Sequence, residues 1–329
     1  MQRDKKTIGV NPLLKAFTER SQRLEQVAIK TFEKIAEGVV WVDIVEPSDE
    51  EEEWIKAVYN EELPTEDEIE EIQSSSRFYI DGDKLYINSY FLDDFREHPQ
   101  NITVAFILTG DRLFSMHEVE LTTFRWFRLH ARRNFDGAGD AAKSVLLGLF
   151  ETKIDHLSDV IEEMYADLEL ISKDVLRNTQ NTDMEKLVTE LARLEDLNGK
   201  IRLSIMDQQR VLSLLQRKGR LNAKQLEWLR EILQDIDSLI PHTSFFFEKI
   251  NFLMDATLSF VNIEQNKIIK IFSVAAVAFL PPTLVASIYG MNFKTMPELE
   301  WAFGYPWAIG LMILSALLPL LYFRRQHWL

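Results

Sequence analysis

The stretch YGMNFKTMPELEW, Tyr289 to Trp301, joins two long apolar segments near the end of this 329-residue chain. The first is IFSVAAVAFLPPTLVASIYGMNF (271–293), and the second is WAFGYPWAIGLMILSALLPLLYF (301–323). Each contains 23 residues without a charged side chain, and about 20 apolar residues in a helix cross the bilayer core. The sequence therefore predicts two transmembrane helices. The alternative is a pair of buried helices in a soluble core, which seldom run so long without a charge.

The charges that flank the two segments predict their orientation. Lys267 and Lys270 precede the first segment, Arg324 and Arg325 follow the second, and the loop between them carries one lysine against two glutamates. By the positive-inside rule, both outer flanks lie in the cytoplasm and the loop faces out. The N-terminus has no apolar core of the kind that a signal peptide needs. We therefore expect a multi-pass protein of the cell (inner) membrane with both termini cytoplasmic.

The rest of the chain is strongly acidic. The whole chain carries a net charge of −15 and the residues from Ile271 onward carry +1, so residues 1–270 carry −16. Thirteen acidic residues and one lysine lie between Glu46 and Glu71. Such a surface repels nucleic acid and attracts cations. We expect part of it to be solvated helix surface and part to sense cations. The absence of cysteine excludes disulfides and thiolate sites.

Before the apolar segments, the chain reads as an α/β portion followed by long helices. Runs of β-branched and aromatic residues predict strands at 38–45, 76–80, 84–91, 101–108 and 112–118. Helices are expected at 49–60, 65–73, 140–178 and 183–217, and a further helix begins after Asn222. If that helix continues to about residue 289, it has ~67 residues and is roughly 100 Å long. A lone helix of that length is unstable, so it must pack against copies of itself or the two preceding helices.

These elements predict an α/β cytosolic domain (an αβα sandwich), a long stalk helix and two C-terminal transmembrane helices. The expected boundaries are 1–220 for the cytosolic domain, 221–270 for the stalk, 271–291 for the first span, 292–300 for the external loop, 301–323 for the second span and 324–329 for a cytosolic tail.

One face of the first span has a distinctive composition. Steps of three and four residues along it select mostly small, hydroxyl or amide side chains, with Phe272 beside the row. The row is Asn266, Ile269, Ser273, Ala276, Leu280, Thr283, Ser287 and Gly290. Close helix packing in membranes also selects small residues, so composition alone leaves a pore wall and a packing face almost equally supported. Asn266 favours the pore wall, because an amide facing lipid is costly.

The motifs YGMN (Tyr289–Asn292) and MPEL (Met296–Leu299), the LPPT at 280–283 and the terminal YFRRQHWL together resemble the CorA family of magnesium transport proteins. The resemblance is strong over 250–329 and looser upstream, where WVDIVEPSDEE is consistent with it. It implies a homopentamer in which five first-span helices line a pore, five second spans surround them, and the cytosolic parts form a funnel.

The resemblance further implies that Gly290, Met291 and Asn292 form the external mouth. Mg²⁺ loses its water reluctantly, so a pore that takes the hydrated ion needs acceptors for the bound waters. Five neutral Asn292 amide oxygens would bind it weakly enough for release. On spacing alone, Asn292 is more simply a helix C-cap. Many relatives are acidic at the position of Lys294, so capture by a loop carboxylate is left to Glu298.

Deeper in the pore, the same stripe predicts alternating polar and apolar rings. Thr283 and Asn266 would be the next polar rings, with Asn266 at the cytosolic end. Leu280, Phe272 and Ile269 would be apolar constrictions, which are suited to gating by dewetting.

The family also implies that Mg²⁺ bound between neighbouring cytosolic domains closes the pore, so that Mg²⁺ is both transported and regulatory. Acidic residues of the stalk helix and of the acidic segment are the candidates for this site: Glu231, Asp235, Glu68, Glu70 and Glu71. Co²⁺ and Ni²⁺ are candidate additional substrates.

The sequence does not indicate an enzyme. His117-Glu118 begins a zinc-hydrolase pattern, but Leu121 stands where the second histidine belongs, and no complete phosphate-binding loop occurs. We therefore expect a channel-like uniporter driven by the membrane potential, with itself, the lipid bilayer and divalent cations as partners, and no nucleic acid. The alternatives are a zinc transporter of the same superfamily, against which Met291 argues, and a membrane-anchored divalent-cation sensor without transport.

Overall fold

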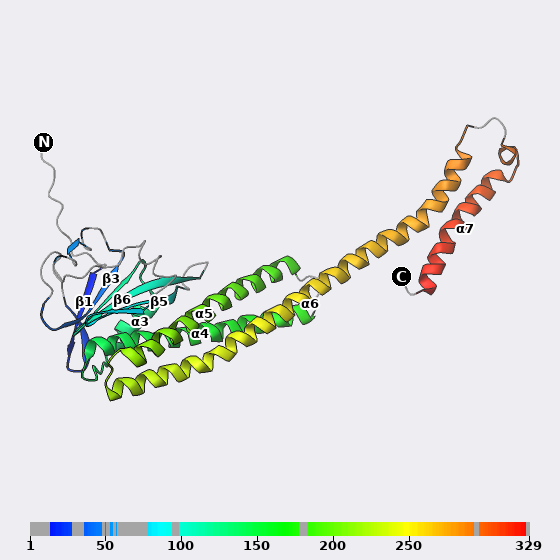
Figure 1. Cartoon of the computed structure of the whole chain (residues 1–329). Coiled ribbons are helices and arrows are strands. Elements are labelled where there is room, and N and C mark those ends of the chain that lie inside the picture. The colour runs from blue at the N-terminus through cyan, green and yellow to red at the C-terminus, as the bar shows by residue number, and fades with distance from the viewer. Residues whose placement is uncertain are drawn as a thin grey trace, which may run out of the picture. The chain divides into compact units, whose positions relative to one another are not determined.

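The computed structural model describes residues 14–27, 36–47, 50, 53, 54, 57, 78–93, 99–177, 183–292 and 296–326. The chain forms two compact units, whose elements are shown in Figure 1. The first unit comprises Met1–Asp174 and Thr189–Phe252, and the second comprises Val175–Val188 and Leu253–Leu329.

The first unit is built on a seven-stranded mixed sheet with the order β2-β1-β3-β7-β6-β5-β4. Strands β3 and β7 pair in parallel, and the other neighbours are antiparallel. The strands are β1 (Leu14–Arg20), β2 (Arg23–Val27), β3 (Val39–Val45), β4 (Phe78–Asp81), β5 (Lys84–Asp93), β6 (Gln100–Thr109) and β7 (Arg112–His117). The five expected strands are confirmed as β3 to β7. The hairpin of β1 and β2 was not predicted.

The two faces of the sheet are covered differently, because successive side chains along a strand point to opposite faces. On one face, Val42 and Phe114 belong to a buried apolar cluster with Trp54, which lies in a short helical segment after β3. On the other face, Phe91 contacts the rings of Phe124 and Phe150, which lie in the two helices that follow β7 in the chain. Helices therefore lie on both faces, which is the expected αβα arrangement. The helices predicted at 49–60 and 65–73 lie mostly outside the described residues.

Helices α3 (Thr122–Ala131), α4 (Ala141–Arg177), α5 (Met184–Lys218) and α6 (Ala223–Tyr289) follow the sheet. The last three confirm the expected long helices, and α6 has the expected 67 residues. Hydrogen bonds between α6 and the region of α4 show that these two helices run in the same direction. The pairs are Gln225 with Asp140, Trp228 with Glu151, and His242 with Tyr165.

Helix α6 continues through three prolines without ending. Proline has no N–H to donate to the carbonyl four residues earlier. Pro281 and Pro282 are adjacent, so the carbonyls of Val277 and Ala278 both lack their helical partner. Membrane helices tolerate such positions.

Two helical glycines differ in the space around them. A Cβ added at Gly148 of α4 would lie 2.5 Å from a ring carbon of Phe127, and that ring is held against Trp41 and Phe135. A Cβ at Gly199 of α5 would meet nothing within 4 Å.

We therefore expect opposite results from the same substitution at these two positions. Gly148→Ala should destabilise the protein by about 1–2 kcal/mol, because overpacking exceeds the helix gain. Gly199→Ala should stabilise it by about 0.5–1 kcal/mol through helix propensity alone. Thermal unfolding of the full-length protein in detergent measures both. A higher melting temperature for Gly148→Ala would contradict this packing.

Candidate functional site

The second unit contains the part of the chain that is suited to cross a membrane. The end of α6 and helix α7 (Gly304–Arg325) are long and apolar enough to do so. Trp301 precedes α7, Tyr305 lies in its first turn and Tyr322 lies near its end, so Tyr305 and Tyr322 are about 26 Å apart along the axis. This matches the aromatic belts at the two surfaces of a bilayer. Arg324 and Arg325 occupy the last turn.

Burial divides the membrane segment of α6 into two faces. Val274 and Ala278 are its buried residues, and Ala308 is buried on α7. These small side chains are typical of close helix packing in membranes. At 100° per residue, the helix places the row from Asn266 to Ser287 on the side opposite Val274 and Ala278.

All eight residues that the sequence predicts to line a pore are exposed in the single chain: Asn266, Ile269, Phe272, Ser273, Ala276, Leu280, Thr283 and Ser287. The exposed fraction reaches 71% for Phe272 and 65% for Leu280. The hydroxyl of Thr283 donates to the carbonyl of Phe279 at 2.8 Å, so its oxygen lone pairs are left to accept hydrogen bonds. The face thus offers polar acceptors between apolar positions, and no part of the chain that the structure describes covers it.

The tripeptide Gly290, Met291 and Asn292 directly follows α6, and all three residues are exposed. Gly290 donates its N–H to the Ala286 carbonyl at 2.9 Å. Its φ is not left-handed, so the backbone conformation does not require glycine at this position. An added Cβ would lie 3.2 Å from the same carbonyl oxygen.

The loop beyond the tripeptide contains the short 3-10 helix η1 (Pro297–Leu299), on which Glu298 is exposed. Gly304 packs tightly there, since a Cβ would come within 2.1 Å of the Glu298 carbonyl oxygen. Lys294 lies outside the described residues.

The acidic residues of the predicted regulatory site fall in two places. Glu231 and Asp235 lie one turn apart on α6 in the first unit. Glu68, Glu70 and Glu71 lie outside the described residues, so the structure does not relate them to α6.

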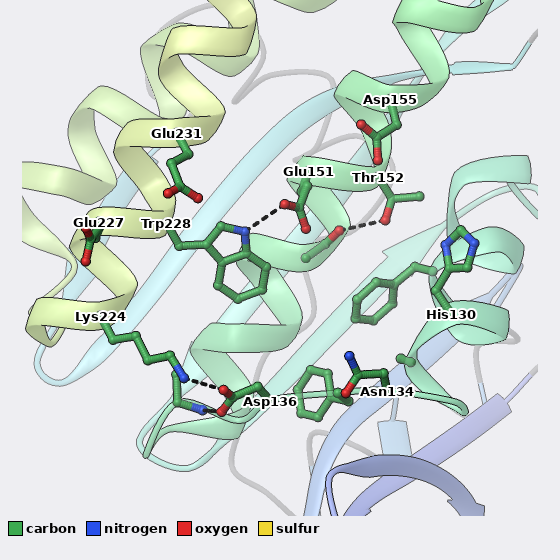
Figure 2. A pocket seen from close by; sticks show the side chains of 15 residues that line it. His130, Asn134, Asp136, Glu151, Thr152, Asp155, Lys224, Glu227, Trp228 and Glu231 are labelled. Carbon is green, nitrogen blue, oxygen red and sulfur yellow. Dashed lines mark hydrogen bonds and ion pairs between the residues drawn. The ribbon is translucent and has the colours of Figure 1, made fainter.

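Glu231 faces acidic residues of α4 in the same chain, across a cavity of about 450 Å³ (Figure 2). Glu151 accepts a hydrogen bond from the indole N–H of Trp228 at 3.0 Å. Burial raises the pKa of Glu151, and so do the nearby charges of Asp155, Asp235 and Glu231, despite that hydrogen bond. Burial likewise raises the pKa of Asp155, together with the charges of Asp159 and Asp235 and against that of His130. Glu151 and Asp155 were not predicted as site residues, although their spacing of four residues on a helix is visible in the sequence.

A second charged cluster is buried between the sheet and α3. One carboxylate oxygen of Asp43 accepts from Ser115 Oγ at 2.8 Å and lies 3.0 Å from Nε2 of His117. The other accepts from Arg128 Nη1 at 2.8 Å, and Arg128 also contacts Glu120. Burial would raise the pKa of Asp43, but the charge and hydrogen bond of His117 and the contacts with Arg128 and Ser115 lower it. His117 is therefore a partner of the buried Asp43 carboxylate. This agrees with the incomplete zinc-hydrolase pattern.

Comparison with known proteins gives consistent matches over nearly the whole chain. A profile of the family described as "CorA-like Mg2+ transporter protein" matches residues 36–325. Proteins called "Magnesium transport protein CorA" from Salmonella typhimurium and Escherichia coli are 48% identical to it over 318 residues, 96% of this chain and 100% of theirs. The solved structure of the CorA magnesium transporter from Methanocaldococcus jannaschii matches with a TM-score of 0.74 at 19% identity, covering 98% of this chain and 100% of that one.

Proposed function

The chain belongs to the CorA family of Mg²⁺ transporters, and we propose that it works as a homopentameric Mg²⁺ channel driven by the membrane potential. One observation carries the proposal. The face of α6 opposite Val274 and Ala278 is exposed along the whole membrane segment and alternates polar acceptors with apolar side chains. A single chain with two spans cannot enclose an aqueous path, so this face requires copies of itself.

In the proposed pore, five Asn292 side chains meet the hydrated ion at the external mouth. Mg²⁺ keeps its waters, and the amide oxygens accept hydrogen bonds from those waters without binding the metal itself. Neutral oxygens hold the ion weakly enough to release it. The side-chain carbonyl of Asn292 therefore selects the hydrated Mg²⁺ ion, and Gly290 and Met291 hold Asn292 in position.

Further along the pore, the rings of Thr283 and Asn266 repeat this weak binding. Between them, Leu280, Phe272 and Ile269 form narrow apolar zones that close the path when they lose water. No bound nucleotide is needed, because a divalent ion gains about 4.6 kcal/mol in crossing 100 mV. Co²⁺ and Ni²⁺ would pass by the same route, since they also carry tightly bound water.

The proposal also covers orientation and control. Lys267, Lys270, Arg324 and Arg325 place both termini in the cytoplasm, with the loop that contains Glu298 outside the inner membrane. Cytosolic Mg²⁺ bound between neighbouring chains, with Glu231 and Asp235 among the contributing residues, would hold the pore shut. Two like-charged surfaces repel once the ion leaves.

Reconstitution tests the proposal directly. The purified protein should have the mass of five chains in detergent, and in vesicles it should admit Mg²⁺ faster as the interior is made more negative. A proton gradient without a potential should not drive Mg²⁺ entry. Stable monomers, or proton-coupled Zn²⁺ transport without Mg²⁺ transport, would refute it.

A further inference from the structure

The turn between η1 and α7, at the end of the loop that follows α6 (Figure 1), is packed tightly at one glycine. Gly304 is the first residue of α7 and is buried, although Trp301 and Trp307 beside it are exposed. The N–H of Gly304 donates to the Trp301 carbonyl at 2.9 Å. The ring of Trp301 lies near those of Phe303 and Trp307, with centroids 6.1 and 6.5 Å away. These contacts hold the turn against the start of α7.

Glycine is needed at position 304 for space and not for backbone freedom. The φ of Gly304 is not left-handed, so alanine could adopt the same conformation, and alanine is the better helix former. A Cβ at this position, however, would overlap the carbonyl oxygen of Glu298. That oxygen belongs to the backbone, so it cannot turn aside as the end of a flexible side chain could. The start of α7 therefore contacts Glu298 of η1 in a way that only glycine permits.

This backbone contact determines where a charged side chain lies. The carboxylate of Glu298 is exposed, and its side chain and carbonyl group are attached to the same Cα, so a shift of the carbonyl also shifts the carboxylate. With three residues and the poorer hydrogen bonds of a 3-10 helix, η1 depends on its neighbours for its place. The contact with Gly304 is therefore well suited to fix the position of the carboxylate.

A carboxylate in this loop acts on the ion before the ion enters the pore. Glu298 follows Asn292 by six positions, and a pentamer would place five copies of it around the mouth. Such a ring attracts a divalent cation and raises its concentration at the entrance. The attraction depends on position, because salt screens exposed charges over about 10 Å at 0.1 M ionic strength. The carboxylate is therefore effective only if it is held close to the path of the ion.

We propose that Gly304 is a positioning residue for ion capture, and that its contact with the Glu298 carbonyl holds the Glu298 carboxylate at the external mouth. A larger side chain at position 304 displaces η1 and weakens the apparent affinity for Mg²⁺, while the maximal rate of transport through the pore is unchanged. The inference rests on the proposed function, because it concerns how the proposed pore collects its ion.

The Mg²⁺ dependence of potential-driven uptake into vesicles separates capture from conduction. In Glu298→Gln, the half-saturating Mg²⁺ concentration should rise at least about tenfold, the lower end of the enrichment that charged entrances give. In Gly304→Ala it should rise at least about threefold, because the carboxylate is moved and not removed. The maximal rate, normalised to protein with the five-chain mass, should stay the same in both variants. An unchanged half-saturating concentration in Gly304→Ala would overturn the proposal.

A double variant distinguishes positioning of Glu298 from a general defect of the loop. If Gly304 acts through Glu298, adding Gly304→Ala to Glu298→Gln should leave the half-saturating concentration at the value of Glu298→Gln alone. Effects that multiply would show that the two residues act independently and would refute the proposal. Raising the ionic strength should also reduce the difference between Gly304→Ala and the unaltered protein, because screening weakens the attraction that the variant disturbs. A difference that salt does not reduce would count against a role in capture.

Gly310→Ala is the matched control, because it adds the same methyl group to the same helix at a position where a Cβ meets no atom of the described chain within 4 Å. Its half-saturating concentration should equal that of the unaltered protein, and an equal rise in both glycine variants would overturn the proposal. If the unaltered protein takes up no Mg²⁺, the proposed function and this inference fail together. If it takes up Mg²⁺ and Glu298→Gln leaves the half-saturating concentration unchanged, only this inference fails.

Discussion

Replacement of Asn292 by alanine is expected to abolish most Mg²⁺ uptake while leaving the oligomer intact. The side chain is exposed directly beyond the end of α6, and in the proposed pentamer five copies contact the waters of the entering ion. Hydrogen bonds that involve charged species are worth about 1.5 kcal/mol or more, so losing even two of the five costs about 3 kcal/mol and roughly 100-fold in ion occupancy. The change removes only surface atoms, and stability should not suffer.

The measurement is potential-driven Mg²⁺ uptake into vesicles, normalised to the amount of protein with the five-chain mass. Asn251→Ala is the matched control, because Asn251 is an exposed asparagine on the same helix but outside the membrane segment, and its uptake should equal that of the unaltered protein. Unchanged uptake in Asn292→Ala would remove the mouth from the mechanism and favour a membrane-anchored sensor.

The second large effect is expected in stability, at the buried cluster of Asp43. Arg128→Met removes the cation that contacts one carboxylate oxygen at 2.8 Å, where the Asp43 side chain is 0% exposed. Breaking a buried pair by removing one partner costs about 3–5 kcal/mol, because the remaining charge has no water. At about 2–4 °C per kcal/mol, the melting temperature should fall by roughly 6–20 °C.

Two comparisons make this stability result specific. Arg193→Met breaks ion pairs with Asp167 and Glu190 at a side chain that is 42% exposed, and it should cost at most about 1 kcal/mol. Adding Asp43→Asn to Arg128→Met should recover part of the loss, because it removes the uncompensated charge. Similar losses of stability from Arg128→Met and Arg193→Met would show that the buried cluster contributes no more to stability than an exposed ion pair.

The pH dependence of this cluster follows from the lowered pKa of Asp43. A carboxyl group with a lower pKa in the folded state binds fewer protons there than in the unfolded chain. Its stabilising contribution is therefore complete above the ordinary aspartate range and is lost as the pH falls through the lowered value. Asp43→Asn should flatten the acid limb of the stability profile.

Much of the fold was predictable because its signals are local. The 67-residue helix α6 was visible in an unbroken run of helical spacing, and its prolines did not end it. By contrast, the hairpin of β1 and β2 was missed. In β1, LKAFTER carries three charges, of which Lys15 and Glu19 are half-buried and Arg20 is exposed. It lacks a β-branched run, and it is held in place by pairing with β3. Only tertiary contacts reveal such a strand.

The candidate sites also differ in how far the sequence alone predicts them. The stripe from Asn266 to Ser287 follows from helical periodicity, and the structure leaves it exposed opposite Val274. The cluster of Asp43, His117 and Arg128 joins residues up to 85 positions apart, so no spacing rule could connect them. An aspartate inside the apolar run VVWVDIV was the one available signal, since a buried carboxylate requires partners.

The adjacent prolines of α6 have a mechanical consequence. With two consecutive carbonyls deprived of donors, at Val277 and Ala278, the rod loses stiffness at one level. We therefore expect the part of α6 beyond Pro282, which carries Thr283, to bend relative to the part that carries Phe272. In the proposed pentamer, the external end of the pore would therefore bend independently of its cytosolic end.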